Sequence, residues 1–460
     1  MNPSLALLGC TVGIVGLFFL DRDKAVCTSK ALWLPVIWLW IVGSRPVSVW
    51  LGINPATQDA SQLLDGSPFD RLVFATLLVL GIIVLIRRNN RTRAFLRASW
   101  PILLYFLYCL LSVIWSDFSD VSLKRWIKSI GDLVMVLIVL TEADPTAGLK
   151  RLFARVGFIL MPFSVLLIRY FGDLGRGYDP NGVPMNTGVT TNKNSLGVIT
   201  LVITLGVMWR VLTLLGAKDQ LNRSRHLLAQ GTLLAFGVAV LVMAHSATSM
   251  ACFVLGGGLM LASGLPLIRG RRVGVHALVL TIFLIGGLTL FLGVESDVVH
   301  ALGRETTLTG RTEIWDAVIP VVPNSAIGTG FESFWLGPRL NIVWSRLSQY
   351  MHVNEAHNGY LEIYLNLGWV GVALIVLILS KGYGNVVAAF RYDPAVGRLL
   401  LAYIFAAAFY SITEAGFRLL NPIWIFLLLA VVAGGGASRG VGALQTVGVT
   451  GRGSRIDAPR

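Results

Sequence analysis

The chain has 460 residues, of which 55% are hydrophobic and only 13% are charged. An average globular domain has about 25% charged residues, so this composition excludes a soluble enzyme, a disulfide-rich secreted scaffold and a disordered protein. The net charge of +14 does not indicate a nucleic-acid partner, because cytoplasmic loops of polytopic membrane proteins are enriched in lysine and arginine. We therefore predict an all-α polytopic membrane protein, whose long apolar runs satisfy their backbone hydrogen bonds within helices.

Thirteen apolar segments follow one another along the chain, and each predicts a transmembrane helix. The second segment is short, and the fifth contains Lys128 and Asp132, so twelve and thirteen spans fit the pattern equally well. The segments lie at about 5–20, 31–43, 72–86, 99–115, 126–141, 152–171, 195–216, 227–244, 247–268, 275–294, 359–380, 399–413 and 418–436.

Two arginine-rich loops predict the orientation of the helices. Segment 87–98 has five arginines and segment 269–274 has three, with six predicted spans between them. An even number of crossings puts both loops on one side, which the positive-inside rule identifies as the cytoplasm. The same count makes segment 295–358 periplasmic and segment 381–398 cytoplasmic.

The chain is thus predicted to consist of transmembrane helices over 1–294, a large periplasmic loop over 295–358, C-terminal transmembrane helices over 359–436 and a tail over 437–460. The Gly/Ser-rich tail is expected to be disordered and cytoplasmic. A connector between two helices needs only a few residues, whereas the large loop has a net charge of −3 and three of the six histidines. We therefore expect this loop, together with the polar outer loop 172–194, to be functional.

The most distinctive polar group joins the large loop to the next apolar run. His357 comes just before the predicted helix, at the outer membrane surface. Asn358, Glu362 and Asn366 are spaced four residues apart and therefore share one helical face. Polar groups within a membrane usually face a cavity or a partner, and a neutral imidazole above them could accept a proton near pH 7. Alternatively, Asn358 only caps the helix and His357 only anchors it at the interface.

Several cations in the outer loops could bind an anionic substrate. A guanidinium group binds phosphate oxygens through paired hydrogen bonds, so two or three cations around one cavity would suit a pyrophosphate. Alternatively, each of them is an ordinary solvated loop residue. The candidate side chains are Arg311, with Glu313 and Trp315 on the same predicted amphipathic helix, and Arg176, Lys193 and Asn194 in the outer loop 172–194.

Two further groups have simpler interpretations. Glu414 and Arg418 are spaced i, i+4 at the last outer turn, which favours an ordinary ion pair. Lys124, Arg125 and Lys128 lie on the predicted outer side, against the positive-inside trend. Either the fifth span is irregular or these three cations bind something anionic.

Several of these motifs together resemble the O-antigen ligase/polymerase family, and in particular its exopolysaccharide-polymerising branch. The resemblance covers roughly residues 90–430. It rests on Gly310-Arg311 with Trp315, on Gly328-x-Gly330-Phe331, on Ala356-His357-Asn358-Gly359-Tyr360-Leu361-Glu362 with Leu365-Asn366-Leu367-Gly368-Trp369-Val370-Gly371, on Trp115-Ser116-Asp117 and on Asn192-Lys193-Asn194-Ser195-Leu196-Gly197.

The resemblance implies a glycosyltransferase of the bacterial inner membrane with the all-helical, polyprenol-dependent (GT-C type) architecture. Such enzymes transfer a glycan from undecaprenyl pyrophosphate to an acceptor hydroxyl on the periplasmic side, without a cofactor or a metal. The resemblance matches His357 to the family's essential loop histidine and Arg311 to its loop arginine. Arg176 is a looser match to the arginine before the Asn-rich turn. At Thr248 and Ser249 the sequence departs from many members, which often have an arginine there.

The expected partners are an undecaprenyl-pyrophosphate-linked glycan, an acceptor glycan or lipid, the lipid bilayer and envelope polysaccharide assembly and export proteins. A transporter or flippase of lipid-linked glycan is one alternative, with a site near the bilayer midplane between repeated halves. A non-enzymatic scaffold is another. The enzyme is favoured because no internal repeat is visible and polar groups gather at the outer surface. The sequence leaves open whether the chain is a polymerase or a ligase.

Overall fold

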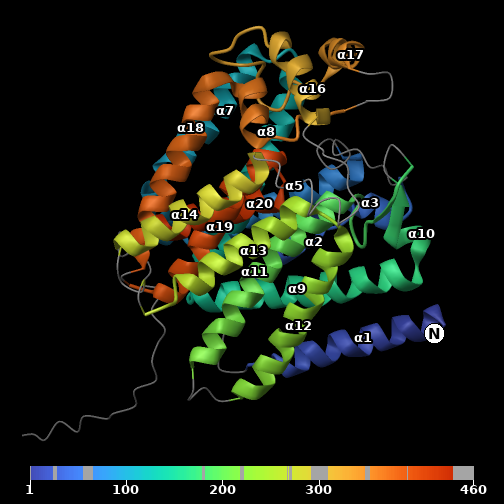
Figure 1. The fold of residues 1–460 in the computed structure, drawn as a ribbon, viewed down its shortest axis with the longest axis vertical. Helices are drawn as coiled ribbons and strands as arrows, with labels where there is room; N and C mark the ends of the chain where they lie inside the picture. The colour runs from blue at the N-terminus through green and yellow to red at the C-terminus, as the bar shows by residue number, and fades with distance from the viewer. Residues whose placement is uncertain are drawn as a thin grey trace, which may run out of the picture.

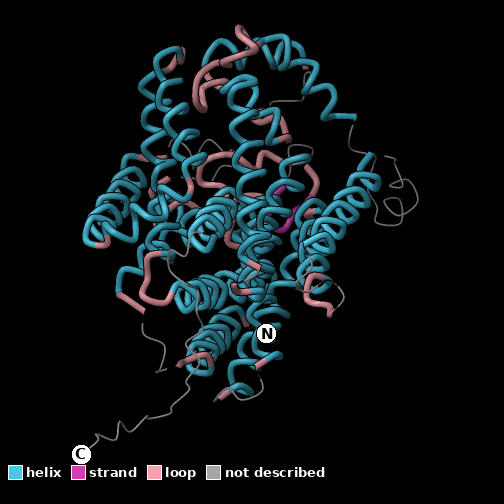
Figure 2. The backbone as a smooth tube through the Cα atoms, turned by 90° about the vertical axis from the view of Figure 1, so that its left-hand side faces the viewer, coloured by secondary structure: helices cyan, strands magenta, loops and turns pink. Residues whose placement is uncertain are grey.

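The computed structural model describes residues 2–23, 28–54, 66–178, 182–217, 222–266, 268, 272–291, 309–347, 353–390 and 392–438. Helices dominate these residues, as predicted, and the one sheet among them is a small two-stranded hairpin (Figure 2). Residues 292–308 and 348–352 of the predicted large loop, and the predicted tail beyond Ser438, lie outside the described residues.

All thirteen predicted segments fall on helices. The helices are α1 (Pro3–Leu20), α2 (Trp33–Val42), α3 (Val47–Trp50), α5 (Pro68–Arg87), α6 (Asn89–Ala98), α7 (Trp100–Leu111), α8 (Ser119–Leu140), α9 (Pro145–Tyr170), α10 (Gly172–Gly175), α11 (Lys193–Gly216), α12 (Arg223–Ala244), α13 (Ala247–Ala262), α14 (Arg272–Phe291), α16 (Thr309–Val318), α17 (Gly337–Arg346), α18 (Gly359–Ala389), α19 (Pro394–Thr413) and α20 (Pro422–Ser438). Short 3₁₀ turns are η1 (Lys30–Leu32), η2 (Ser112–Trp115) and η3 (Ile319–Val321).

Seven of the described helices are long and apolar enough to cross a membrane: α1, α5, α9, α11, α12, α18 and α19. An eighth span results if α6 and α7, which are bent by 86° relative to each other, are counted as one broken helix. Four apolar segments, containing α2, α13, α14 and α20, are shorter. The chain is therefore a polytopic membrane protein, and the twelve or thirteen predicted spans include several segments that form helices below full spanning length.

The centre of the molecule is formed by α11, α19 and α20, which pack against one another (Figure 1). Residues 423–433 of α20 are all buried. This helix is apolar on every side, and such a helix is stable only inside a large protein or a membrane. By contrast, α1 lies at the periphery, where it packs against α9 and α12 and exposes most of its apolar side chains.

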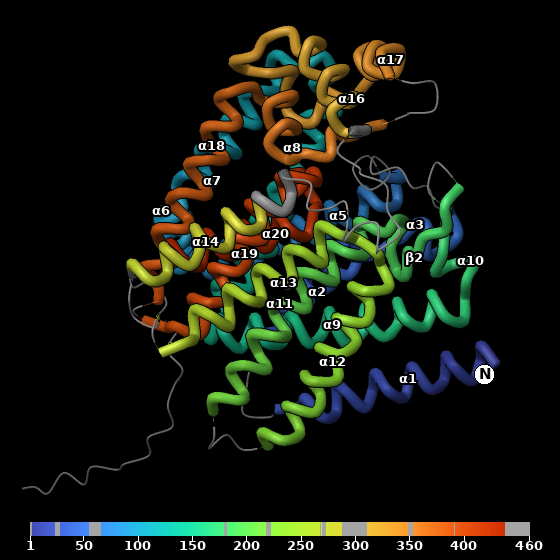
Figure 3. The backbone as a smooth tube through the Cα atoms, in the orientation of Figure 1, coloured from blue at the N-terminus to red at the C-terminus, as the bar shows by residue number. Residues whose placement is uncertain are grey.

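Segments predicted on the same side of the membrane meet in the structure. At one end, α6 packs on α20, and Gly264 after α13 lies against Arg398 at the start of α19. At the other end, the hydroxyls of Thr248 and Thr413 are 2.9 Å apart. We call the first the arginine-rich end and the second the loop end. In Figure 3, α16 and α17 of the loop end lie at the top, and α6 of the arginine-rich end lies at the left.

Helix α18 is broken at Gly368, whose φ of 63° and ψ of −165° are not helical. Segment 324–334 of the large loop packs into the break and pairs with backbone groups there. Such pairing is required, because an unpaired backbone group away from water costs as much as a lost hydrogen bond. The N–H groups of Thr329 and Gly330 donate to the carbonyls of Leu365 and Asn366, and those of Trp369 and Val370 donate to the carbonyls of Ser325 and Ala326.

The Gly328-x-Gly330 motif is required by this packing. Gly328 has a φ of 68°, and a Cβ atom there would lie 2.5 Å from the backbone carbon of Asn366. Gly330 has a φ of 97°, and its Cβ would lie 2.6 Å from the Cβ of Ser116. Both glycines therefore serve the close approach of the loop to the broken helix and to the Trp115-Ser116-Asp117 segment.

Helix α8 shows how one of the three cations of the fifth span is held. It is continuous over Ser119–Leu140, so the span is not irregular. The Arg125 guanidinium is buried and donates a hydrogen bond to the carbonyl of Glu332 in the large loop. Asp132 accepts hydrogen bonds from the Trp38 indole and the Leu420 backbone, each at 2.9 Å. Arg125 therefore connects α8 to the large loop, and Asp132 connects it to α2 and to the segment before α20.

The outer loop 172–194 contains structure that the sequence analysis did not predict. Strands β1 (Arg176–Tyr178) and β2 (Pro184–Asn186) form an antiparallel hairpin, in which Arg176 is opposite Asn186. The Asn186 amide donates to the carbonyl of Met243 near the end of α12 at 2.8 Å. This contact fixes the hairpin at the loop end.

Candidate active site

A single buried carboxylate connects four distant parts of the chain at the loop end. Glu414, which follows α19, is only 6% exposed. It accepts hydrogen bonds from the Asn194 amide at 3.4 Å and from the Arg311 guanidinium at 3.2 Å. The Nδ1 atom of His357 lies 3.3 Å from Oε2 of Glu414, the same oxygen that accepts from Asn194. We call Glu414, Asn194, Arg311, His357 and Glu355 the Glu414 group.

The position of His357 follows from the start of α18. The Asn358 side chain caps this helix, because it accepts hydrogen bonds from the N–H groups of Tyr360 and Leu361, each at 3.0 Å. His357 comes directly before the cap and has a left-handed φ of 48°. The capping interpretation of Asn358 is therefore confirmed. The ring of His357 faces two carboxylates.

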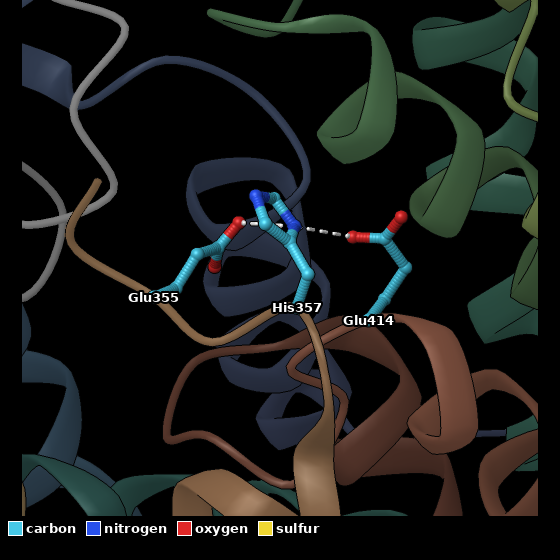
Figure 4. A group of neighbouring side chains, drawn as sticks. All are labelled: Glu355, His357 and Glu414. Atoms are coloured by element: carbon cyan, nitrogen blue, oxygen red, sulfur yellow. Dashed lines mark hydrogen bonds and ion pairs between the residues drawn. The ribbon is translucent and has the colours of Figure 1, made fainter. Parts of the chain in front are cut away.

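Figure 4 shows the imidazole between Glu355 and Glu414. Its Nδ1 atom is 3.3 Å from an oxygen of each carboxylate. Burial alone would lower the pKa of His357, but the charge of Glu355 and the hydrogen bond to Glu414 outweigh this effect and raise the pKa to about 9. This shift favours the protonated form of the imidazole at neutral pH. The role of His357 as a base, which the sequence analysis raised, stays a prediction.

The same three side chains could hold a metal ion. Glu355, His357 and Glu414 each offer one ligand atom, and these atoms lie within 4.8 Å of one another. An imidazole nitrogen with carboxylate oxygens suits several divalent metals. The proton on His357 explains the close approach of the carboxylates equally well, and a metal-free site remains a prediction.

The predicted ion pair between Glu414 and Arg418 is wrong. Helix α19 ends at Thr413 and α20 begins at Pro422, so the i, i+4 spacing does not lie on a helical turn. Arg418 instead contacts Glu332 at 3.2 Å and Glu355 at 3.7 Å. The carboxylate of Glu414 therefore interacts with Arg311 and His357 and not with Arg418.

The polar stripe of α18 positions neighbouring segments. Glu362 is buried, and its two carboxylate oxygens lie 3.1 and 2.9 Å from the indole nitrogen of Trp335, which donates to them. It also accepts a hydrogen bond from the backbone N–H of Ala356. Asn366 accepts a hydrogen bond from the N–H of Phe334 at 3.1 Å. Glu362 therefore fixes the residue directly before His357, and both polar side chains face protein partners.

Helix α16 brings Arg311 to the site, and the predicted helix around this residue is confirmed. The Trp315 indole donates to the carbonyl of Ala356 at 2.9 Å, which connects α16 to the His357 segment. Arg311 keeps 23% of its side chain exposed, so part of the guanidinium is accessible. Glu313 lies two positions further along α16, and the helical period places it on a different side of the helix.

The remaining predicted cations differ in their relation to the site. Lys193 begins α11 and is the neighbour of Asn194, so it lies at the margin of the Glu414 group. Arg176 lies on β1 and donates from Nε to the carbonyl of Ile168 at 2.9 Å. Within the described ranges, no contact joins Arg176 to Glu414. The structure thus places Arg311 and Asn194 on Glu414, and the role of Arg176 in binding pyrophosphate stays a prediction.

Sequence reasoning overlooked the central position of Glu414 and the importance of Glu355. One signal was present, since Glu414 follows an apolar run directly, and ionisable residues at such positions are often functional. Glu355 lay within a motif that was singled out for its histidine. The i, i+4 spacing suggested Arg418 as the partner of Glu414, whereas its partners in the structure are Asn194, Arg311 and His357.

Two comparisons with known proteins bear on this site. The sequence profile of the O-antigen ligase family matches residues 232–376, which include Arg311 and His357. The chain is also 24% identical over 293 residues to the exopolysaccharide production protein ExoQ of Rhizobium meliloti (strain 1021). That similarity covers 61% of this chain and 63% of the length of the relative. This chain is therefore similar to the O-antigen ligase family over residues 232–376 and to ExoQ over about three fifths of each chain.

Proposed function

We propose that this protein is a glycosyltransferase of the bacterial inner membrane that takes a glycan from undecaprenyl pyrophosphate. It polymerises or ligates the glycan by transfer to an acceptor hydroxyl on the periplasmic side. The observation that carries the proposal is the Glu414 group, in which two cations, Arg311 and protonated His357, are held together at the loop end. The membrane fold and the two family comparisons support it.

Arg311 and His357 bind the donor pyrophosphate in this proposal. Negative charge accumulates on the pyrophosphate as the glycosidic bond breaks, and fixed cations stabilise that charge by a few kcal/mol. Glu414 holds both cations in place before the donor arrives, which lowers the cost of organising the site. Lys193, at the margin of the group, adds a third positive charge.

The chemical step is a direct displacement at the anomeric carbon. The acceptor oxygen forms a bond to this carbon while the bond from the carbon to the phosphate oxygen breaks, and lipid pyrophosphate leaves with the electron pair. The acceptor proton passes to Glu355, whose side chain is 25% exposed compared with 8% for Glu414. Attack opposite the leaving group inverts the anomeric configuration.

The test is transfer by the purified protein with a lipid-linked oligosaccharide donor and no ion gradient. We expect bond formation by the wild type and loss of transfer in His357→Ala and His357→Gln, because neither variant provides the cation. His276→Ala is a matched control, since this histidine lies on α14 and contacts Tyr383 outside the Glu414 group. Full activity of both His357 variants would make the histidine an interfacial anchor. Movement of the donor across the membrane without bond formation would favour the flippase.

The lipids that accumulate in cells lacking the protein distinguish its two modes of action. A single repeat stranded on undecaprenyl pyrophosphate indicates a polymerase, because chain extension is then the missing step. A full-length polymer stranded on the lipid indicates a ligase, because only the final transfer is missing.

A further inference from the structure

A second polar site lies at the arginine-rich end, away from the Glu414 group. It is a pocket of about 690 Å³ where the end of α5 and the start of α6 meet the end of α8. Its lining includes Ser29, Arg87, Arg88, Asn90, Arg91 and Glu142. Three arginines and one glutamate give this lining a net charge of +2.

The protein fixes two of the three arginines in place. Arg88 donates to Glu142 at 2.7 Å and to the Ser29 hydroxyl at 2.8 Å. Arg91 donates to the backbone carbonyl of Glu142 at 2.9 Å, at the end of α8. Arg87 is exposed and, among the described residues, makes no hydrogen bond or ion pair. The pocket therefore combines an ordered wall with one cation that is available to a ligand.

The backbone adds to the positive character of the pocket. Helix α6 begins at Asn89, and its cap residue Arg88 provides no capping side chain. The first N–H groups of a helix have no partner within the helix, and the helix dipole makes this end favourable for anions. Asn89, Asn90 and Arg91 of this first turn all line the pocket.

The surroundings indicate a lipid ligand. Helix α5 is one of the seven spanning helices, and Ile86, directly before Arg87, is 68% exposed. Ile83 and Val79 on the same helix are 43% and 56% exposed. Helix α6 is bent by 86° relative to α7, and it buries Phe95 while exposing Arg93 and Arg97. Phe95 packs against α20, so the exposed apolar side chains next to the pocket belong to α5, and acyl chains along α5 place a headgroup in the pocket.

We propose that this pocket binds the phosphate of an anionic phospholipid headgroup at the membrane surface. The proposal rests on the membrane fold and is independent of the proposed glycosyl transfer. An anionic lipid such as phosphatidylglycerol matches the +2 lining, whereas a zwitterionic headgroup brings a cation into the same pocket. Juxtamembrane arginines favour anionic lipids by about 1 kcal/mol each.

The experiment measures binding of short-chain lipids to the purified full-length protein in detergent. The probes are dioctanoyl phosphatidylglycerol, dioctanoyl phosphatidylcholine and inorganic phosphate. Arg87→Glu is compared with Arg93→Glu, which makes the same charge change on the exposed face of α6 at a residue that does not line the pocket. An unchanged melting temperature verifies that both variants are folded.

We expect saturable binding of phosphatidylglycerol, weakened about tenfold or more by Arg87→Glu and changed less than about twofold by Arg93→Glu. Equal weakening by both variants would overturn the site in favour of diffuse surface charge. Equal affinity for phosphatidylcholine would show an apolar site without headgroup recognition. Inorganic phosphate binding as tightly as the lipid would show a site for a soluble anion, and no saturable binding of phosphatidylglycerol would also overturn the proposal.

Discussion

The charge of His357 is set by its two carboxylate neighbours and determines what the side chain can do. A histidine with an ordinary pKa would be largely neutral at pH 7 and could accept a proton. A pKa raised to about 9 favours the charged form, which donates hydrogen bonds and supplies positive charge. In the proposed mechanism the acceptor proton therefore goes to Glu355, which is the more exposed of the two carboxylates.

This charge state predicts the pH dependence of transfer. Because the pKa of His357 is raised to about 9, the cation persists through neutral pH and is lost as the pH rises through about 9. We expect kcat/KM for transfer to fall across that range in the wild type, and to fall in the same way in the His276→Ala control. A rise through pH 9 would instead show that the neutral imidazole is the active form.

Arg311 is expected to act through its geometry as well as its charge. Arg311→Lys keeps the charge but loses the planar fork that binds two phosphate oxygens. We expect kcat/KM to fall about tenfold or more, with normal amounts of protein in the membrane. Arg346→Lys makes the same change in α17, where Arg346 contacts the carbonyl of Ala317 at 3.4 Å, and should leave transfer unchanged. Wild-type activity of Arg311→Lys would reduce Arg311 to a solvated loop residue.

The Glu355, His357 and Glu414 cluster also makes the metal question testable. If His357 carries a proton, no cation is needed between the carboxylates, and transfer should be unaffected by dialysis against EDTA. Metal analysis of the purified protein should find no stoichiometric divalent ion. Loss of activity on chelation, restored by a single divalent metal, would assign the three side chains as metal ligands.

At the scale of elements, the break in α18 explains why the large loop has glycine at positions 328 and 330. Segment 324–334 fits into the break through glycines with positive φ. An apolar run with two glycines is compatible with a continuous helix, so the sequence analysis predicted no break at Gly368. The β1–β2 hairpin escaped prediction for a related reason, because its three-residue strands are too short to show an alternating pattern.

This packing predicts an unequal response to two glycine substitutions. Gly328→Ala places a Cβ 2.5 Å from the backbone of α18 at a φ of 68°, and we expect a loss of about 1–3 kcal/mol or more in stability. Gly258→Ala in α13 meets nothing within 4 Å and should be neutral or slightly stabilising. Thermal unfolding in detergent measures both. Equal melting temperatures for the two variants would contradict the proposed role of Gly328.

At the scale of the whole molecule, the arginine-rich end and the loop end are predicted to lie on opposite sides of the membrane, and thiol labelling tests this topology. Ser345 on α17 and Tyr392 before α19 are both exposed, and they lie on predicted opposite sides of the membrane. In a background without the four native cysteines, Ser345→Cys should react with an impermeant thiol reagent applied from the periplasm, whereas Tyr392→Cys should not. The reverse pattern would invert the predicted topology.

The helices and their grouping could be predicted because hydropathy and arginine distribution are local or additive properties of a sequence. The connections within the site could not, because they depend on packing between distant residues. Asn194 and Glu414 are 220 positions apart, and Arg311 and Glu414 are 103 apart. A motif identifies His357 as important, but only the fold shows which carboxylates determine its charge.

The dependence of the Glu414 group on four distant segments has a consequence for biosynthesis. Asn194 and Arg311 are both synthesised before α19, whereas their shared carboxylate follows this helix. A nascent chain that has not passed residue 414 therefore lacks the group that holds the cations together. Of the described helices only α20 follows residue 414, so the ribosome must complete all the others before the Glu414 group can form.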